Sequence, residues 1–295
     1  MKEHRPTLAV LAAGVAWGVI SLFIRGLSTA GLSTMQITAA RFLIAAPLMF
    51  LVLAVKDRAL LKVRVRDLWM FVGTGIVSLV LFNALYFHTM VESQASVAVV
   101  LLYTSPAFVM LLSAPLFRER ITSRKLLCLG MTVLGCALVS GLFGGDYRLS
   151  AGILLAGLGS GFFYALYTVF ARFALRRYDS LTVTAYTFLF AALGSLPFGR
   201  FGETAAVVAA APGTILLLLG SSFLCTLLPY LLYTWGLQRM ESGRAAILAA
   251  VEPMVGAVLG MTLYREPHSP LKLLGILLIL GAMVLLGRDG KKKTE

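Results

Sequence analysis

Long runs of apolar residues, separated by short polar segments, dominate the pattern along this chain. A helix needs about 20 mostly apolar residues to cross a bilayer, because a spanning segment must satisfy its own backbone hydrogen bonds in hydrocarbon. The predicted spans cover residues 8–25, 34–55, 67–90, 94–117, 124–142, 150–172, 181–200, 213–237, 243–264 and 270–287. The pattern therefore predicts an all-α membrane protein with ten transmembrane helices and no sizeable soluble domain.

Composition supports lipid as the solvent of this chain. Apolar residues make up 59% of the 295 and charged residues only 13%, whereas a soluble domain carries about 25% charged residues. The formal net charge of +13 does not indicate nucleic acid, because the basic residues lie in short loops between apolar runs. Cys128, Cys136 and Cys225 lie inside such runs without metal-ligand spacing and are interpreted as packing residues. We expect no cofactor and no nucleic-acid partner.

The distribution of Lys and Arg predicts the orientation in the membrane. With the N-terminus inside, twenty of the 26 basic residues fall in inner segments and five in outer segments, while Arg41 lies within a span. Cytoplasmic loops are enriched in Lys and Arg, so both termini are predicted to be cytoplasmic. The basic run at residues 291–293 is then an inner anchor that contacts anionic lipid.

The second half of the chain resembles the first when the two are aligned without a gap so that Gly161 falls on Gly14. Further identical pairs in this alignment, which we call the repeat alignment, include Arg25/Arg172, Tyr86/Tyr233, Pro106/Pro253, Arg118/Arg265 and Glu119/Glu266. Five spans separate equivalent positions, and because five is odd the second half must insert upside down. We therefore predict two inverted five-helix repeats, residues 1–145 and 146–295, around a central cavity. Inverted repeats of this kind are the usual construction of secondary transporters.

The matched stretches resemble the signature of the drug/metabolite transporter superfamily, in its EamA-type branch. The motif residues are Tyr86, Leu101-Leu102-Tyr103-Thr104-Ser105-Pro106 and Leu116-Phe117-Arg118-Glu119-Arg120, and again Tyr233, Glu252-Pro253 and Leu263-Tyr264-Arg265-Glu266. The resemblance covers essentially the whole chain. It implies ten helices, a cavity lined mainly by spans 1, 3, 4, 6, 8 and 9, and export of small organic molecules across a bacterial inner membrane. The second repeat departs at Phe188 and Pro267, where the first has Arg41 and Arg120.

Three ionisable residues lie within or near the ends of spans. Glu252 falls near the bilayer midplane, where a carboxylate is costly; it is a candidate proton-coupling group or partner of a cationic substrate, or else a brace for the break at Pro253. Arg41 is a candidate ligand for a substrate carboxylate, or it snorkels outward or pairs with Glu92. His88 is a candidate gating or proton-carrying group, or an ordinary interfacial residue.

Aromatic residues at mid-membrane depth add a candidate surface for an amphiphilic ligand. The full predicted cavity set is Trp17, Arg41, Asn83, Tyr86, His88, Tyr103, Tyr164, Tyr167, Tyr230, Tyr233 and Glu252. Pro106 and Pro253 interrupt spans 4 and 9 at matched depth and are predicted hinges. The alternative interpretation of these Tyr and Trp residues is that they belong to interfacial aromatic belts. The alternative for the two prolines is that each is only a tolerated bend in its helix.

Two further features concern the ends and faces of the spans. Arg118-Glu119 and Arg265-Glu266 close spans 4 and 9 and are interpreted as structural ion pairs or gates. Three pairs of glycines at spacing four, beginning at Gly14, Gly157 and Gly256, permit close helix approach, which we assign to packing within the monomer rather than to a dimer interface. A monomer or weak homodimer is expected.

These features favour a secondary transporter that exports small amphiphilic metabolites, with amino acids or their analogues as the first candidates. No Walker A loop is present, so transport is expected to be passive or driven by a gradient, with protons as a candidate coupling ion. A nucleotide-sugar or other organic-anion exchanger is the alternative, but a phosphate dianion calls for more than one intramembrane basic residue. A membrane-embedded lipid enzyme is the rival from another class. Such an enzyme is expected to have clustered acids or histidines at one membrane face, and this sequence shows no such cluster.

Overall fold

The computed structural model describes residues 4–93, 95–142, 150–263 and 269–287, and the regular structure within these ranges is entirely helical. The α-helices are α1 (Arg5–Gly18), α2 (Ile20–Thr29), α3 (Thr34–Lys56), α4 (Leu68–Val72), α5 (Leu81–Glu92), α6 (Ala95–Leu102), α7 (Ser105–Phe117), α8 (Ser123–Val139), α9 (Ala151–Ala174), α10 (Ser180–Ser195), α11 (Phe201–Ala210), α12 (Gly213–Ser222), α13 (Leu228–Leu237), α14 (Ser242–Ala249), α15 (Glu252–Leu263) and α16 (Pro270–Gly287). Two π-helical segments, η3 (Gly73–Val80) and η6 (Phe223–Leu227), join α4 to α5 and α12 to α13. Short 3-10 turns occupy η1 (Arg58–Leu61), η2 (Val65–Asp67) and η5 (Leu196–Phe198).

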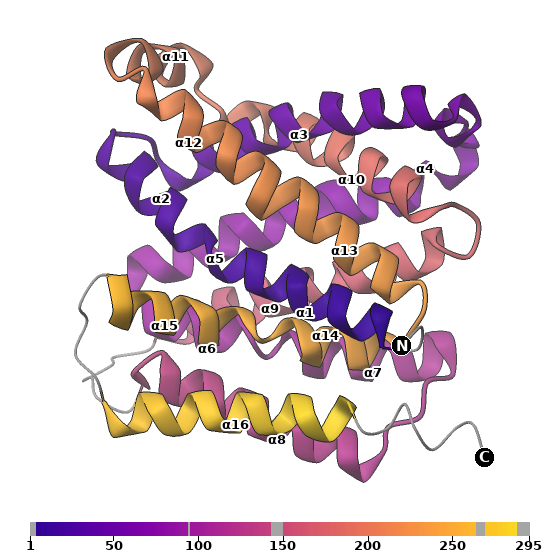
Figure 1. The fold of residues 1–295 in the computed structure, drawn as a ribbon, viewed down its shortest axis with the longest axis vertical. Coiled ribbons are helices and arrows are strands. Elements are labelled where there is room, and N and C mark those ends of the chain that lie inside the picture. The colour runs from indigo at the N-terminus through magenta and orange to yellow at the C-terminus, as the bar shows by residue number, and fades with distance from the viewer. Residues whose placement is uncertain (1–3, 94, 143–149, 264–268, 288–295) are drawn as a thin grey trace.

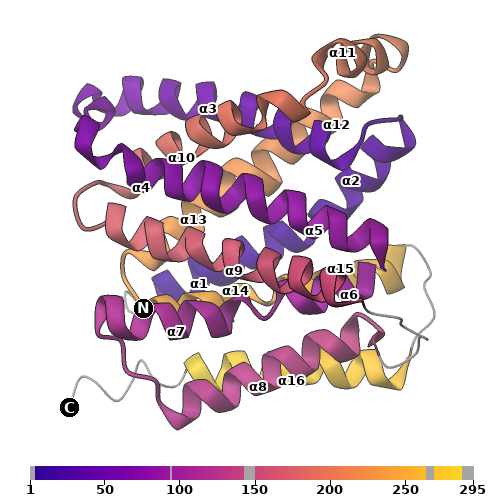
Figure 2. The same ribbon diagram turned by 180° about the vertical axis from the view of Figure 1, so that it is seen from behind.

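Helices cover every predicted span. Within the described ranges, eight helical stretches, from Arg5–Thr29 to Ser242–Leu263, are long and apolar enough to cross a membrane. The remaining two predicted spans correspond to α8 and α16, which are shorter and lie side by side at one edge of the bundle (Figures 1 and 2). The count of ten crossings therefore stays a prediction.

The outer surface of the bundle is apolar. Large side chains such as Leu51, Leu216 and Leu277 are more than half exposed. A soluble monomer rarely exposes apolar side chains over such a wide area. Surfaces of this kind, on helices long enough to span a bilayer, identify a multi-pass membrane protein.

The helices share a common direction across the bundle, so the bundle has two ends (Figure 1). We call the end at which α1 begins the N-terminal face; α3 and α13 end there, and α14 begins there. The opposite face holds the beginning of α3 and the end of α5. Helix α11, which the apolar pattern did not predict, lies at the opposite face, where Glu203 accepts a hydrogen bond of 3.5 Å from Gln36 in the first turn of α3. Its ten residues are too few to cross a bilayer.

The start of α3 follows directly from its sequence. The hydroxyl of Ser33 accepts a hydrogen bond from the backbone N–H of Gln36 at 3.3 Å, and the Gln36 side chain accepts one from the N–H of Ser33 at 2.8 Å. This reciprocal capping box satisfies donors that have no partner inside the helix. It places Arg41 about two turns into α3, well below the opposite face.

Packing between helices follows the repeat alignment. Helix α1 lies against α13, and its counterpart α9 lies in the same way against α5. Helices α3 and α10, which are counterparts, pack on each other, as do α8 and α16. Spans 4 and 9 also break at equivalent positions: α6 ends before Tyr103 and Thr104, and α14 ends before Ala250 and Val251. The internal repeat of the sequence is therefore also a repeat of tertiary contacts.

Gly14 and Gly161 are equivalent residues that permit close approach to these two breaks. A Cβ atom on Gly14 would lie 2.7 Å from the carbonyl oxygen of Ala249, and one on Gly161 would lie 2.8 Å from that of Leu101. Real Cβ atoms do not approach backbone oxygens so closely, and neither helix backbone can move aside cheaply. The sequence repeat at these glycines thus reflects a packing requirement in both halves.

Candidate functional site

A cavity of about 290 Å³ lies between the two halves and is the candidate binding site. Its lining residues are Trp17, Ile20, Ser21, Ile24, Thr34, Thr38, Arg41, Phe42, Phe82, Asn83, Tyr86, Phe87, Met90, Leu102, Tyr164, Tyr230 and Glu252. The lining extends from Glu252 at mid-span to Thr34 and Met90 near the helix ends, so the cavity leads toward the opposite face. Seven of the predicted cavity residues contribute to it.

Arg41 is held in the cavity wall by contacts with span 8. Its Nε donates to the hydroxyl of Thr226 at 2.8 Å, and one terminal nitrogen donates to the backbone oxygen of Cys225 at 2.8 Å. Both acceptors belong to the π-helical segment η6, where the wider turn frees carbonyl oxygens from the helical ladder. These bonds use two of the five N–H donors of the guanidinium. Arg41 therefore neither reaches outward nor relies on Glu92 for these contacts.

Glu252 is the first residue of α15, the second half of broken span 9. A carboxylate at the beginning of a helix is stabilised by the partial positive charge of the unpaired N–H groups. Glu252 and Arg41 both line the cavity. The site thus presents one carboxyl group and one guanidinium to the same small space.

Asn83 and Tyr86 occupy the wall formed by α5. The amide nitrogen of Asn83 donates to the carbonyl oxygen of Leu79 at 2.6 Å, in the other π-helical segment, η3. Segments η3 and η6 overlap in the repeat alignment, so each repeat has a widened turn at the same depth with a carbonyl bound by a polar side chain. In the wall of the cavity, polar side chains therefore bond to backbone carbonyl groups that a regular α-helix would use in its own hydrogen bonds.

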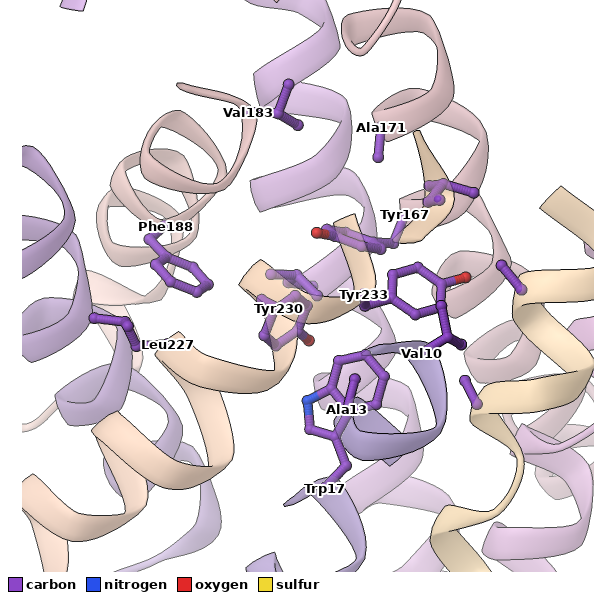
Figure 3. Close-up of a cluster of buried hydrophobic side chains, with 14 of the residues drawn as sticks. Val10, Ala13, Trp17, Tyr167, Ala171, Val183, Phe188, Leu227, Tyr230 and Tyr233 are labelled. Atoms are coloured by element: carbon purple, nitrogen blue, oxygen red, sulfur yellow. The ribbon is translucent and has the colours of Figure 1, made fainter. Parts of the chain in front are cut away.

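Aromatic rings form the floor of the cavity. Trp17 lies 5.1 Å from Tyr230 and 5.5 Å from Tyr233 between ring centroids, and Tyr167 lies 5.2 Å from Tyr230 (Figure 3). Phe188, which replaces the arginine of the first repeat, packs edge-on against Tyr230 at 5.5 Å. Edge-to-face contacts of this kind stabilise a rigid apolar surface.

Beneath this floor, hydrogen bonds join α9 to α13. The hydroxyl groups of Tyr167 and Thr234 are 2.8 Å apart, and those of Thr168 and Tyr233 are 2.7 Å apart. All four side chains are buried. Tyr103, also buried, lines a small void of about 20 Å³ beside Tyr167 and Tyr233, which has room for about one water molecule. Tyr103, Tyr167 and Tyr233 therefore lie below the main cavity.

Polar contacts also tie together the N-terminal face. The carboxylate of Glu119 accepts hydrogen bonds from the backbone N–H groups of Ser242 and Gly243, at 2.7 and 3.2 Å, and so caps the beginning of α14. Lys125, which is 6% exposed, forms an ion pair with Glu241 at 2.6 Å. Glu119 thus joins the two halves as a helix cap.

The remaining predicted residues fall elsewhere. Arg118 ends α7 in the left-handed conformation, with a φ of 58°. Pro106 and Pro253 are the second residues of α7 and α15, a position at which proline fits because no N–H is needed there. His88 is exposed on α5, outside the cavity lining. Arg265 and Glu266 lie outside the described residues.

The sequence pattern did not single out several residues of the site. Thr226 holds Arg41, while Thr168 and Thr234 pair with tyrosines below the floor. Threonines are common in membrane helices, where their hydroxyls usually bond to the preceding turn, so their type alone carries no signal. The π-helical segments leave no mark in hydropathy either. The repeat alignment could have identified Thr168, because its counterpart Ser21 also carries a hydroxyl.

A multi-pass bundle whose two similar halves enclose a cavity with few polar groups has the construction of a membrane transporter. The family model of the EamA-like transporter family matches residues 5–141 and, a second time, residues 150–288. The chain therefore belongs to the EamA-like transporter family, as the sequence motifs predicted.

Known relatives agree with this assignment. An uncharacterized transporter of Archaeoglobus fulgidus is 28% identical over 284 residues, which cover 95% of this chain and 93% of the relative. A probable amino-acid metabolite efflux pump of Salmonella typhimurium is 26% identical over 200 residues, 65% of this chain and 67% of the pump. A solved crystal structure superposes with a TM-score of 0.79 at 17% identity, covering 98% of this chain and 99% of the other, which shows a shared fold. The names of these relatives indicate transport rather than catalysis.

Proposed function

We propose that this protein is a secondary transporter that exports amino acids or related zwitterionic metabolites by alternating access between two inverted repeats. The observation that supports this most is the pair of opposite charges, Arg41 and Glu252, in the wall of one cavity. The name of the Salmonella relative points to the same substrate class.

The geometry suits a small zwitterion. The guanidinium of Arg41 keeps three N–H donors beyond its two bonds to span 8, enough for a forked contact with a carboxylate. Glu252 complements an ammonium group. Trp17, Tyr164 and Tyr230 offer apolar and aromatic surface to a side chain. The volume of about 290 Å³ suits a ligand of amino-acid size better than a nucleotide.

The predicted orientation assigns this structure to one stage of the proposed export cycle. If the N-terminal face is cytoplasmic, the cavity of this structure is open to the outside and closed toward the cytoplasm. An exporter releases substrate in this state and must then return with the site empty or with a coupling ion. Glu252 can hold either an ammonium group or a proton, so proton exchange is the coupling we propose.

The alternative of a nucleotide-sugar or organic-anion exchanger receives less support. A phosphate dianion calls for several basic side chains, and Arg41 is the single basic residue in the described lining of the cavity. A lipid enzyme would need a cluster of acids or histidines, whereas that lining contains one carboxylate and no histidine.

Counterflow in proteoliposomes tests the proposal. Vesicles loaded with an unlabelled neutral amino acid should accumulate the labelled form transiently, because an alternating-access carrier exchanges substrate without net flux. Empty vesicles and vesicles loaded with the corresponding decarboxylated amine are the controls. Absence of counterflow across a panel of aliphatic, aromatic and charged amino acids would reject the substrate class.

Replacement of Arg41 by lysine should raise the KM for amino acids by about tenfold or more, while the charge is retained. Lysine cannot bond to Thr226 and Cys225 and also present a forked pair of donors, because its ammonium is a point charge. The loss corresponds to about 1.4 kcal/mol of binding free energy. Competition by the decarboxylated amine is the control and should change little. An equal loss for both ligands would show that Arg41 is structural.

A further inference from the structure

The closed side of the molecule shows which contacts seal this protein. At the N-terminal face, Thr168 on α9 and Tyr233 on α13 join their hydroxyls at 2.7 Å. Below them, one terminal nitrogen of Arg172 donates to the backbone oxygens of Leu237 and Met240, the latter at 2.9 Å. These oxygens lie at the C-terminal end of α13 and just after it, where helical carbonyls lack partners within the helix. The seal therefore includes the Thr168–Tyr233 hydroxyl pair and the arginine clamp, in addition to the Tyr167–Thr234 pair described above.

Each part of this seal has a counterpart in the repeat alignment. Thr168 and Tyr233 correspond to Ser21 and Tyr86, so the pair of hydroxyls is preserved. Arg172 corresponds to Arg25, an identity at a position where lipid-facing sequence would favour an apolar residue. The carbonyls of Leu237 and Met240 correspond to those of Met90 and Ser93, in the last turn of α5 and at its C-cap.

These counterparts surround the open half of the molecule. Ser21 and Tyr86 both line the cavity that leads to the opposite face. The Ser21 hydroxyl donates instead to the backbone oxygen of Gly18, the last residue of α1, at 3.4 Å. Ile20 and Phe87, the counterparts of the Tyr167–Thr234 pair, also line the cavity. The positions Ile20, Ser21, Tyr86 and Phe87 therefore line the cavity, whereas their four counterparts are in contact on the closed side.

The backbone differs between the two halves at the place where this difference arises. Helix α9 is continuous from Ala151 to Ala174 and carries both Thr168 and Arg172. Its counterpart is divided at Val19 into α1 and α2, and Ser21 and Arg25 both lie on α2. Helix α2 packs on α12 (Figure 1). A change of angle at Val19 therefore moves both residues together relative to α5.

We propose that Arg25 and the pair Ser21–Tyr86 form the second gate of this transporter. When α2 aligns with α1, Ser21 bonds to Tyr86, Ile20 packs on Phe87, and Arg25 donates to the carbonyl oxygens of Met90 and Ser93. This closes the cavity at the opposite face, while the matching contacts at the N-terminal face separate. The inference rests on the proposed alternating access, but not on the identity of the substrate.

Chemical cross-linking during turnover tests this assignment. The double variant Ser21→Cys/Tyr86→Cys should react with a short, reducible bifunctional thiol reagent, since a tyrosine holds the two backbones too far apart for a direct disulfide. Substrate should increase the rate of cross-linking, and the cross-linked protein should stop exchange until it is reduced. The pair Thr168→Cys/Tyr233→Cys is the matched control and should cross-link in the resting protein. The single variant Ser21→Cys controls for the buried native cysteines.

A charge variant gives an independent measurement. Arg25→Ala should lower the rate of counterflow by at least about tenfold, as expected for loss of a charge-assisted group from a gate, with substrate binding from the opposite face retained. Arg25→Lys should restore part of the rate. Arg200→Ala, an exposed arginine near the same face with a weak ion pair to Glu203 at 3.4 Å, should have no effect.

The outcomes separate the gate from the substrate assignment. Cross-linking of the first cysteine pair without a response to any amino acid supports the gate and rejects the substrate class. The gate is overturned if the first pair never reacts while the control pair does and the variant elutes as a folded monomer or dimer. Full counterflow by Arg25→Ala would overturn it equally.

Discussion

Replacement of Gly14 by alanine should destabilise the protein by about 1–3 kcal/mol, because the added methyl group meets a backbone oxygen that cannot rotate away. That oxygen, of Ala249, would lie 2.7 Å from the new Cβ, and a side-chain atom of Val251 would lie 2.5 Å from it. Gly161→Ala should have a similar effect through Leu101. Thermal unfolding in detergent, followed by size-exclusion chromatography, measures the change.

The control variant has the opposite expected sign. Gly130 lies within α8 with no atom within 4 Å of the position of a Cβ. Gly130→Ala should therefore stabilise by roughly 0.5–1 kcal/mol, the ordinary gain from removing glycine from a helix. If Gly14→Ala and Gly130→Ala shift the unfolding temperature equally, the close contact between α1 and the break in span 9 does not exist in solution.

Replacement of Glu252 by glutamine should abolish the dependence of transport on a pH gradient and leave counterflow. The amide cannot take up or release a proton, so a proton can no longer exchange for substrate at this site. Its oxygen still accepts a hydrogen bond from an ammonium group, so substrate exchange continues with a higher KM. Efflux from vesicles with and without an imposed pH gradient measures the first effect, and counterflow without a gradient measures the second.

Two results would contradict this role of Glu252. Stimulation by the pH gradient that persists in Glu252→Gln would place the coupling site elsewhere. Loss of counterflow together with loss of the folded monomer or dimer peak would make Glu252 a brace for the start of α15. Glu203→Gln is a suitable control, because Glu203 is an exposed acid on α11 that does not belong to the cavity lining.

Much of the architecture could be predicted because it follows from the apolar pattern of single segments and from the repetition of that pattern along the chain. Hydropathy identifies an apolar run without knowledge of its neighbours, and every predicted run is mainly helical over the residues that the structure describes, with breaks in spans 4 and 9. The repeat alignment identified Gly14 and Gly161 before their contacts were visible. Helix α11 was missed because a short apolar helix at the end of the bundle has neither the length of a span nor the polarity of a loop.

The candidate site was predicted less completely, since it depends on contacts between distant residues. Arg41 and Glu252 could be identified as candidate site residues from their residue types, because charged groups are costly within a membrane. Nothing in the sequence near Arg41 indicates Thr226, which lies 185 residues away along the chain. The tyrosines looked alike in sequence, yet Tyr86 and Tyr230 line the cavity whereas Tyr167 and Tyr233 lie in the seal below it.

The sequence by itself determined that this chain is a membrane protein with two similar halves, that a proline marks a matched position in each half, and that a carboxylate precedes the second of these prolines. These properties follow from the composition of single segments and from their repetition. Only the tertiary structure decided that the N-terminal face is closed and the opposite face open, that Arg41 is bound to a π-helical turn, and that the first span is divided at Val19 into α1 and α2. The two halves have similar contacts available, so which side is sealed depends on how the helices pack against each other, and no single segment carries that information.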